Sequence, residues 1–468
     1  MWAIDKNRSL GIIVSSIFLG VVAPNLFSDG MFNDGLTYAA ISRNMSEGLG
    51  SFWNPHFTYG LLSGFHEHPP LALGLQSLCF KLFGDSIYIE RIYSLFTFFL
   101  VGLIIVHLWK HFTKSYKNSW LPLLLWTTVS TVSWACTNNM LENTMTVFVS
   151  LSVLLLLKSK EKNGYLLLFL SGLALSFAFL SKGFTALFVW SMPLFAWLIY
   201  RDEGFLKMAL RSLLVIAATA LPIVSLYLFS EGAENHFNNY FKYQVIGSIQ
   251  NVVTVNSRFA IVGEFLQASI IPLLVTLLLV ARGFMKNRIQ AKEDIKRNAK
   301  HSLFLFLVIL SGILPIMVSM KQSGFYILSV YPLLAVSLSL LLHSNVESLV
   351  DNISRKQTSL LRIIALFLLI ISISLSVAQV GRVGRDKDKI ADCYKIIDVV
   401  EENSLINLSA DLYTDWSLHA YMARYGNVSL IVANKEHKYY LTDRLDEHLP
   451  DYDKVDVELN TLVLYQRR

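Results

Sequence analysis

The sequence predicts an all-α membrane protein that crosses the bilayer about eleven times and ends in a small α/β domain. Three observations predict this. Hydrophobic residues make up 54% of the 468 residues and charged residues only 16%, against about 25% charge in a typical soluble domain. The mean hydropathy is +0.48. The apolar residues also gather in long blocks, which is the pattern of membrane-spanning helices.

Eleven apolar segments are candidates for spans of about 20 residues. They lie near residues 10–27, 90–109, 119–136, 143–157, 164–180, 184–200, 208–229, 259–281, 302–320, 325–342 and 358–378. The fourth is short, so its ends are the least defined. The first lies at the N-terminus, where a signal peptide would lie. No small-residue cleavage site follows it, so we expect a retained first helix.

Lys and Arg set the expected orientation. With the N-terminus inside, the inside segments hold 21 of these residues and the outside loops hold seven, although the outside loops are longer in total. The positive-inside rule therefore predicts a cytoplasmic N-terminus, and an odd number of spans puts the C-terminus outside. The expected location is the inner (plasma) membrane. The net charge of +6 is spread over short loops, which fits membrane topology and not a nucleic-acid partner.

Few other chemical signals are present. Cys79, Cys136 and Cys393 lie far apart, so they predict neither a disulfide framework nor a zinc site. The sequence contains no GxGxxG segment and no P-loop, so nothing indicates binding of a soluble nucleotide.

Three segments are expected outside the membrane. Residues 28–89 form the first outside loop, and a second loop runs from about residue 230 to 258. We expect a membrane domain over residues 1–378 and an extracytoplasmic α/β domain over residues 379–468.

The C-terminal domain shows both strand and helix patterns. Residues 428–433 and 455–465 are rich in β-branched and aromatic residues, which favours strands. Residues 415–425 have apolar residues at helical spacing and predict a helix.

The first outside loop is unlike a simple connector, because it holds two amphipathic segments. Residues 36–45 have helical spacing, and so does the stretch that follows Pro69 and Pro70, a pair suited to a helix start. Such helices would lie along the interface. Polar clusters precede both: Asn33 with Asp34, and residues 66–68 (His-Glu-His). A lipid phosphate headgroup would lie at the same depth.

These polar clusters have simpler interpretations, which the sequence leaves open. Asp34 could cap the first amphipathic helix. His66, Glu67 and His68 could form a solvated turn. Two histidines and a glutamate could also bind a metal, but three adjacent ligands rarely share one tetrahedral ion, so a divalent metal is left open and not assigned.

Five short motifs, in order over about residues 28–340, give the sequence a family resemblance. They are residues 34–45 (DGLTYAAISRNM), 65–71 (FHEHPPL), 83–85 (FGD) with Glu90 and Arg91, 180–183 (LSKG), and Lys321 with Tyr326, Tyr331 and Pro332. They resemble motifs of GT-C fold membrane glycosyltransferases, among them the protein O-mannosyltransferases and the lipid A aminoarabinose transferases. The resemblance does not select one member, and it does not extend beyond Gln379.

The resemblance implies an inverting transfer of a sugar from a polyprenyl monophosphate to a lipid, protein or glycan acceptor. Asp34 matches the acidic residue that acts at the acceptor, so its implied role is general base. Glu142 matches a second acidic position, where the aminoarabinose enzymes usually have Asp. Gly35 stands where the family has Glu. No organic cofactor is implied.

The same resemblance implies contacts to the substrate or its phosphate. The residues concerned are Tyr38, Glu67, His68, Lys182, Arg258 and Lys321. Cations there would stabilise the charge that develops on a phosphate leaving group. Lys182 could also be a residue that snorkels to the interface. His68 replaces a family lysine, and histidine binds phosphate only when it is protonated or as a neutral donor.

Three other functions are open on the sequence. A transporter or flippase of lipid-linked sugars would carry charges near the midplane on broken helices, whereas here the charges collect at the outer ends. A ligase or polymerase that uses lipid-diphosphate glycans would also work on the outer face. A scaffold without catalytic activity would not need the side chain of Asp34.

Overall fold

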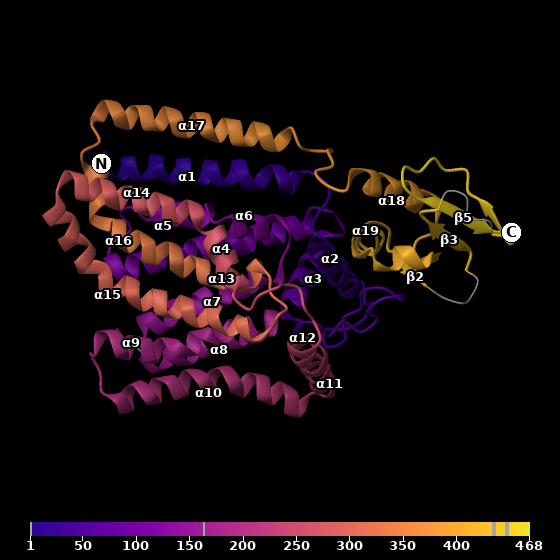
Figure 1. Cartoon of the computed structure of the whole chain (residues 1–468), viewed down its shortest axis with the longest axis horizontal. Helices are drawn as coiled ribbons and strands as arrows, with labels where there is room; N and C mark the ends of the chain where they lie inside the picture. The colour runs from indigo at the N-terminus through magenta and orange to yellow at the C-terminus, as the bar shows by residue number, and fades with distance from the viewer. Residues whose placement is uncertain (1, 162–163, 433–436, 445–448) are drawn as a thin grey trace.

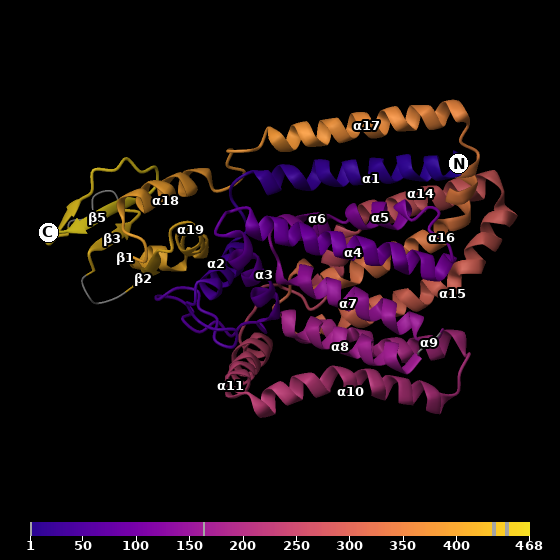
Figure 2. The ribbon, with the colours of Figure 1, turned by 180° about the vertical axis from the view of Figure 1, so that it is seen from behind.

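The computed structural model describes residues 2–161, 164–432, 437–444 and 449–468. Long helices form a bundle, and a small mixed domain lies beyond one end of it (Figure 1). The N-terminus lies at the opposite end of the bundle from that domain, as the view from behind also shows (Figure 2). The two ends of the chain are thus on opposite sides of the bundle.

Within the described residues, eight helices are long and apolar enough to cross a membrane, and a bent pair adds a ninth. The eight are built on α1 (Trp2–Phe27), α4 (Ile89–Thr113), α7 (Leu141–Lys158), α8 (Gly164–Lys182), α10 (Phe205–Phe229), α15 (Arg288–Ile313), α16 (Tyr331–Asp351) and α17 (Arg355–Val377). Short 3-10 helices extend two of them, η3 (Leu314–Val318) after α15 and η4 (Gly324–Val330) before α16. The chain is therefore a multi-pass membrane protein, as expected.

Two of the eleven expected spans, residues 119–136 and 259–281, are each divided between two helices. Residues 119–136 form α5 (Trp120–Thr127) and α6 (Ser130–Thr137), separated by an extended Val129. The hydroxyl of Ser133 donates to the carbonyl of Thr127 across this break, an alternative to the helical hydrogen bonds.

The second divided span, and a span that changes from 3-10 to α-helix, lie later in the chain. Residues 184–200 form a 3-10 helix, η1 (Phe184–Ser191), followed by α9 (Met192–Tyr200). Residues 259–281 fall on α13 (Ala260–Ala268) and α14 (Ile270–Lys286), which meet at 59°. Hydropathy does not detect such breaks, because the residues on both sides are equally apolar.

The first outside loop holds both expected helices, α2 (Asn33–Ser46) and α3 (Leu71–Phe83). They lie between the bundle and the C-terminal domain (Figure 1). The second outside loop forms α11 (Glu231–Asn239), a π-helical turn η2 (Tyr240–Ile246) and α12 (Gly247–Gln250). In α2, every residue from Gly35 to Asn44 is buried, so this helix is enclosed by protein on both of its faces.

The C-terminal domain packs helices against a five-stranded sheet of order β2-β1-β3-β5-β4. Its elements are α18 (Lys387–Val399), β1 (Leu405–Leu408), η5 (Ala410–Thr414), α19 (Trp416–Gly426), β2 (Ser429–Ile431), β3 (Tyr439–Thr442), β4 (Tyr452–Lys454) and β5 (Val463–Arg467). Strand β1 runs parallel to β2 and β3, and β5 is antiparallel to β3 and β4.

The predicted helix at 415–425 is confirmed as α19, and the strand predicted at 428–433 is confirmed as β2, although Ala433 lies outside the described residues. The strand predicted at 455–465 is wrong before Val463, because that stretch leaves the sheet between β4 and β5.

The hydrophobic core of the C-terminal domain does not end at the domain's own residues. Met31, just ahead of α2, and Leu36, near its start, belong to the same buried cluster as Ile390, Leu418 and Leu464. The helix that carries Asp34 is therefore packed partly into the C-terminal domain.

Candidate active site

The predicted site residues come from five separate stretches that meet at the end of the bundle nearest the C-terminal domain. Asp34 and Tyr38 lie on α2, and Glu67 and His68 lie in the turn before α3. Glu142 begins α7, Lys182 ends α8, and Lys321 lies in the segment before η4.

Lys182 is the centre of this cluster. Its side chain is buried, and its Nζ lies 3.1 Å from Oε1 of Glu142 and 3.1 Å from Nε2 of His68. The same Nζ lies 5.6 Å from the ring centre of Tyr38 and 6.0 Å from that of Tyr326. A carboxylate and two aromatic faces thus stabilise a cation that would otherwise be costly in this position. The side chain turns inward and not along the lipid surface.

His68 is held as a neutral imidazole. Burial, and after it the charges of Lys182 and Lys321, place the pKa of His68 well below 6.5. Because the ammonium of Lys182 must donate, Nε2 of His68 accepts, and the ring proton belongs on Nδ1. Nδ1 is buried and has no hydrogen-bond partner in the described part of the chain.

Burial and nearby lysines shift the pKa values of Asp34 and Glu67 in opposite directions. Burial raises the pKa of Asp34 above its ordinary value, while Lys182 and Lys321 lower it. Burial also raises the pKa of Glu67, which feels the same two lysines and the charge of Asp34. These couplings show that the two acids and two lysines share one electrostatic environment. A carboxyl group with a raised pKa is better matched to proton transfer near neutral pH.

Lys321 approaches from another side. Its Nζ donates to Oε1 of Gln244 at 3.2 Å and to the hydroxyl of Ser248 at 3.4 Å. Burial, as the largest cause, lowers the pKa of Lys321, and the charge of Glu67 opposes that shift. This lysine therefore joins the second outside loop to the cluster.

One cavity connects the two lysines. It has a volume of about 760 Å³, including open space at its mouth. Its polar lining includes His68, Lys182 and Lys321. Most of the remaining wall is apolar and includes Phe184, Val245, Ile249, Pro315, Ile316 and Val318. The cavity is thus suited to an amphiphile with an anionic end.

Five of the eight predicted residues do not line this cavity, namely Asp34, Tyr38, Glu67, Glu142 and Arg258. Arg258 donates through Nη1 to the carbonyl of Met317 at 3.2 Å and to that of Val318, so it braces the backbone beside the cavity and does not line it. Glu142 has no exposed surface. It lies behind Lys182, and its Oε2 has no hydrogen-bond partner within the described residues.

The start of α2 is fixed by the turn between α6 and α7. Asp34 is the second residue of the helix and not its cap, because the N-cap position is Phe32. Oδ1 of Asn138 accepts from the amide of Phe32 at 2.9 Å, and Nδ2 of Asn139 donates to the carbonyl of Gly35 at 3.0 Å. The capping interpretation of Asp34 is therefore wrong, which leaves its carboxylate free for another role.

Sequence reasoning did not assign several residues that the structure adds to the site. Tyr326 was part of a recognised motif, but its position beside Lys182 depends on the fold. Gln244 and Ser248 lie in a loop without a recognised motif, so no sequence signal pointed to their contacts with Lys321.

No three His, Cys, Asp or Glu side chains of the described residues lie close enough together to hold a metal ion. Nδ1 of His66 lies 3.0 Å from Nδ1 of His236, which forms a pair of imidazoles and not a group of three.

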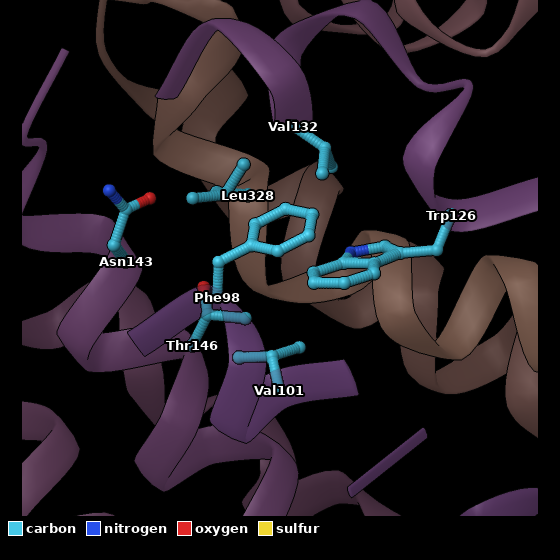
Figure 3. Close-up of a pocket in the computed structure, with 7 residues that line it drawn as sticks. All are labelled: Phe98, Val101, Trp126, Val132, Asn143, Thr146 and Leu328. Atoms are coloured by element: carbon cyan, nitrogen blue, oxygen red, sulfur yellow. The ribbon is translucent and has the colours of Figure 1, made fainter. Parts of the chain in front are cut away.

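A second, smaller cavity, with room for about one water molecule, lies within the bundle (Figure 3). Asn143 and Thr146 of α7 contribute to its lining, together with Phe98, Val101, Trp126, Val132 and Leu328. The rings of Phe98 and Trp126 stack at 3.9 Å between centroids. Its wall has no charged group, so it is a packing gap at the α5–α6 break and not part of the charged cluster.

Part of the chain matches a known family at the level of sequence. Residues 67–229, which are 163 of the 468, match the family model described as dolichyl-phosphate-mannose-protein mannosyltransferase. That stretch includes Glu67, His68, Glu142 and Lys182. No curated protein sequence matches the chain.

Solved structures match nearly the whole chain. ArnT from Cupriavidus metallidurans bound to undecaprenyl phosphate has 13% identity and a TM-score of 0.67, with 97% of each chain covered. The same ArnT in the apo state has 12% identity and a TM-score of 0.65, with 98% of this chain and 97% of that chain covered.

An archaeal relative has the same architecture over a smaller share of its length. The oligosaccharyltransferase AglB from Archaeoglobus fulgidus, in complex with an inhibitory peptide and a dolichol-phosphate, has 12% identity and a TM-score of 0.54. The match covers 94% of this chain and 69% of that one. The chain therefore has the GT-C fold of these membrane glycosyltransferases, as the sequence motifs predicted.

Proposed function

We propose that this protein is a glycosyltransferase that moves a monosaccharide from a polyprenyl-phosphate carrier to an acceptor on the outer face of the inner membrane. The observation that carries the proposal is the cavity in which Lys182 and Lys321 share an otherwise largely apolar wall. A lipid phosphate combines the two properties that this wall would recognise. The undecaprenyl phosphate bound to the structurally similar ArnT supports the same class of donor.

The donor phosphate would lie between the two lysines. Lys182 and Lys321 would neutralise the charge that grows on the leaving phosphate, and the Nδ1 proton of His68 would add a neutral donor. This role suits the histidine that stands in place of the family lysine. The apolar wall would cover the first isoprene units.

Asp34 would act as the general base. The acceptor hydroxyl would attack the anomeric carbon while its proton passes to the carboxylate of Asp34. The bond from the anomeric carbon to the phosphate oxygen would break, and polyprenyl phosphate would leave. A single displacement of this kind inverts the anomeric configuration. The acceptor class, whether lipid A, protein or another surface glycan, stays open.

The other predicted residues would support these two roles. Glu142 would hold Lys182 in place through the 3.1 Å ion pair. Tyr38 presents its ring to the same ammonium, and Glu67 would orient the sugar, the acceptor or Lys321. Arg258 would shape the cavity mouth through the carbonyls that it binds.

The proposed topology has a cytoplasmic N-terminus and an extracytoplasmic C-terminal domain. The basic inside loops support this orientation, and the opposite positions of the two ends agree with it (Figure 1). A reporter fused after Arg468 should then be active only outside the cytoplasm, and cytoplasmic activity would contradict the orientation.

The test is sugar transfer from a panel of radiolabelled polyprenyl-phosphate monosaccharides, with candidate acceptors, by purified wild type and Asp34→Asn. The expected result is that wild type consumes one donor, while the variant binds that donor but transfers about 10²- to 10⁴-fold more slowly. Near-normal turnover by the variant would contradict the assignment of the base. If wild type neither binds nor consumes any donor, a transporter or a lipid-diphosphate ligase becomes the better reading.

A further inference from the structure

The helix that carries Asp34, α2, packs against the C-terminal domain on the face opposite Asp34. Helix α2 packs against α3 and against α19. Arg43 follows Asp34 by nine residues, about two and a half turns, so the two side chains leave opposite faces of α2. The face opposite the proposed base is thus the face that meets the C-terminal domain.

Arg43 makes the first set of contacts between α2 and the C-terminal domain. Its Nη1 donates to the carbonyl of Arg424 at 3.1 Å, and its Nη2 donates to the carbonyl of Ala423 at 3.0 Å and to Oδ1 of Asn427 at 2.9 Å. These acceptors lie at the C-terminal end of α19, where helix carbonyls lack partners and attract cations. Arg43 therefore ties α2 to the end of α19.

Arg424 makes the second set of contacts. Its side chain points from α19 toward the end of the first outside loop and the start of α4. Its Nε and Nη2 donate to the two oxygens of Glu90 at 3.1 and 3.0 Å, and Nη1 donates to Asp85 at 2.8 Å. Nη2 also donates to the carbonyl of Ser86 at 2.8 Å. Only 2% of the Arg424 side chain and 1% of the Glu90 side chain are exposed. Glu90 lies at the start of the spanning helix α4, so Arg424 locks α19 to the bundle.

A third contact fixes the chain just ahead of the helix. The hydroxyl of Tyr421, one turn before Arg424, donates to the carbonyl of Met31 at 3.2 Å. Met31 and Leu36 flank Asp34 in sequence and are buried in the core of the C-terminal domain. Both the start and the far face of α2 are thus attached to α19, and α19 is attached to α4 through Arg424.

We propose that Arg424 is a positioning residue for the transfer reaction, which sets the place of Asp34 by docking α19 between α2 and α4. This inference rests on the proposed function. Arg424 contacts neither the cavity nor its lysines, because those belong to α8 and to the segment before η4. The C-terminal domain would then orient the base relative to a donor that the bundle holds independently.

This arrangement makes a loss of turnover distinguishable from a loss of donor affinity. Weakening the Arg424 contacts should let α2 shift while Lys182 and Lys321 stay in place, so turnover falls and donor affinity does not. A displacement of about 1 Å is enough to slow an enzymatic step about 10²-fold. A residue that only maintains the fold would lower donor affinity and turnover together.

The experiment compares full-length Arg424→Met, Arg424→Met with Glu90→Met, and Arg444→Met with wild type, all in lipid nanodiscs. The double variant removes both buried charges, which lets the fold persist without an unpaired glutamate. Arg444 is the matched control, since it is an arginine of the same domain that is 62% exposed beside Asp411. Each variant is measured for kcat, for KM and for binding of the polyprenyl-phosphate sugar.

The expected result is a fall in kcat of about 10²-fold for Arg424→Met and about tenfold for the double variant, with donor binding unchanged and Arg444→Met like wild type. If Arg424→Met does not fold, the double variant decides. A double variant with wild-type kcat would overturn the proposal, and so would a parallel loss of donor binding or an equal loss in Arg444→Met. Failure of the wild type to bind any donor would instead contradict the proposed function.

Discussion

The ammonium of Lys182 lies 3.1 Å from Oε1 of Glu142, a carboxylate with no exposed surface. The two residues end one spanning helix and begin another, α8 and α7. This pairing stabilises a buried cation at the end of the bundle nearest the C-terminal domain. Without a counter-charge, burying that cation would cost free energy. Its remaining contacts are a neutral imidazole and two aromatic rings, so an anionic ligand would find the cation already in place.

We predict that Lys182→Met weakens donor binding about 10- to 100-fold, the worth of a charge-assisted hydrogen bond. Glu142→Gln should destabilise the fold by about 3–5 kcal/mol, because it leaves Lys182 buried without a counter-charge. The double variant should be less destabilised than Glu142→Gln alone. Thermal unfolding in detergent and donor binding by calorimetry measure these effects.

Lys117 provides a surface control for this pair. Its ammonium lies 3.0 Å from Glu347 and 2.9 Å from Asp351, but its side chain is 30% exposed. Lys117→Met should therefore change stability by no more than about 1 kcal/mol. Additive effects of Glu142→Gln and Lys182→Met would show that the two side chains do not interact.

We predict an acid limb in the pH profile of kcat/KM that lies above 3.8, the ordinary pKa of an aspartate. Burial raises the pKa of Asp34, and a base must be deprotonated, so activity should rise as the pH rises through that pKa. Lys321 lowers the pKa of Asp34. Lys321→Gln should therefore move the limb to still higher pH, as measured on its residual activity.

The direction of that movement is the decisive outcome. A limb that moves to lower pH in Lys321→Gln, or stays where it is, would mean that the titrating group is not Asp34. As a control, Lys242→Gln changes an exposed lysine of the second outside loop, which does not appear among the influences on Asp34, and should leave the limb in place.

The sequence predicts the spanning helices well because a hydrophobic block must be a helix in lipid, where backbone groups have no water to bind. It does not predict the break at Val129, since Trp126 and Val132 on either side are as apolar as the rest. Strand β1 was missed because its sequence, Leu-Ile-Asn-Leu over Leu405–Leu408, does not alternate between apolar and polar residues.

For the candidate site, too, the sequence identifies individual residues but not the contacts between them. The motifs placed Asp34, His68 and Lys182 individually, but Lys182 and His68 are 114 residues apart, and their contact follows from tertiary packing alone. The role of Glu142 as the partner of Lys182 likewise needed the fold. The attachment of α2 to the C-terminal domain had no sequence signal, because the family resemblance ends before Arg424.

Gly35 illustrates how packing explains a departure from the family pattern, which has Glu at this position. A Cβ on Gly35 would lie 2.0 Å from the carbonyl oxygen of Asn138. Gly35→Ala should therefore displace the start of α2 and slow transfer about 10²-fold, even though alanine favours helices by about 1 kcal/mol. Transfer assays with saturating donor measure the loss.

Gly263 is the matched control for this substitution. It is also a helical glycine, in α13, and a Cβ there would meet nothing within 4 Å. Gly263→Ala should leave transfer unchanged and should stabilise the protein slightly. A Gly35→Ala variant with normal turnover would mean that α2 can move away from Asn138 without cost to the reaction.

The cavity lined by Phe98 and Trp126 allows a test of the packing itself (Figure 3). Val101 lines this cavity and is buried. Val101→Ile adds one methylene to an apolar space, so we predict a gain of about 0.8 kcal/mol and a higher unfolding temperature in detergent. Val101 does not belong to the charged cluster and lines no wall of the cavity that holds Lys182 and Lys321, so transfer should not change.

Val149 is the control, because it is buried in the same core but lines none of the described cavities. Val149→Ile should lower the unfolding temperature, since an extra methylene in a filled core costs about 1–3 kcal/mol. The opposite signs of two identical substitutions would demonstrate that the gap is real. If Val101→Ile also destabilises the protein, the side chains around Phe98 are already close-packed, and the break between α5 and α6 leaves no free space.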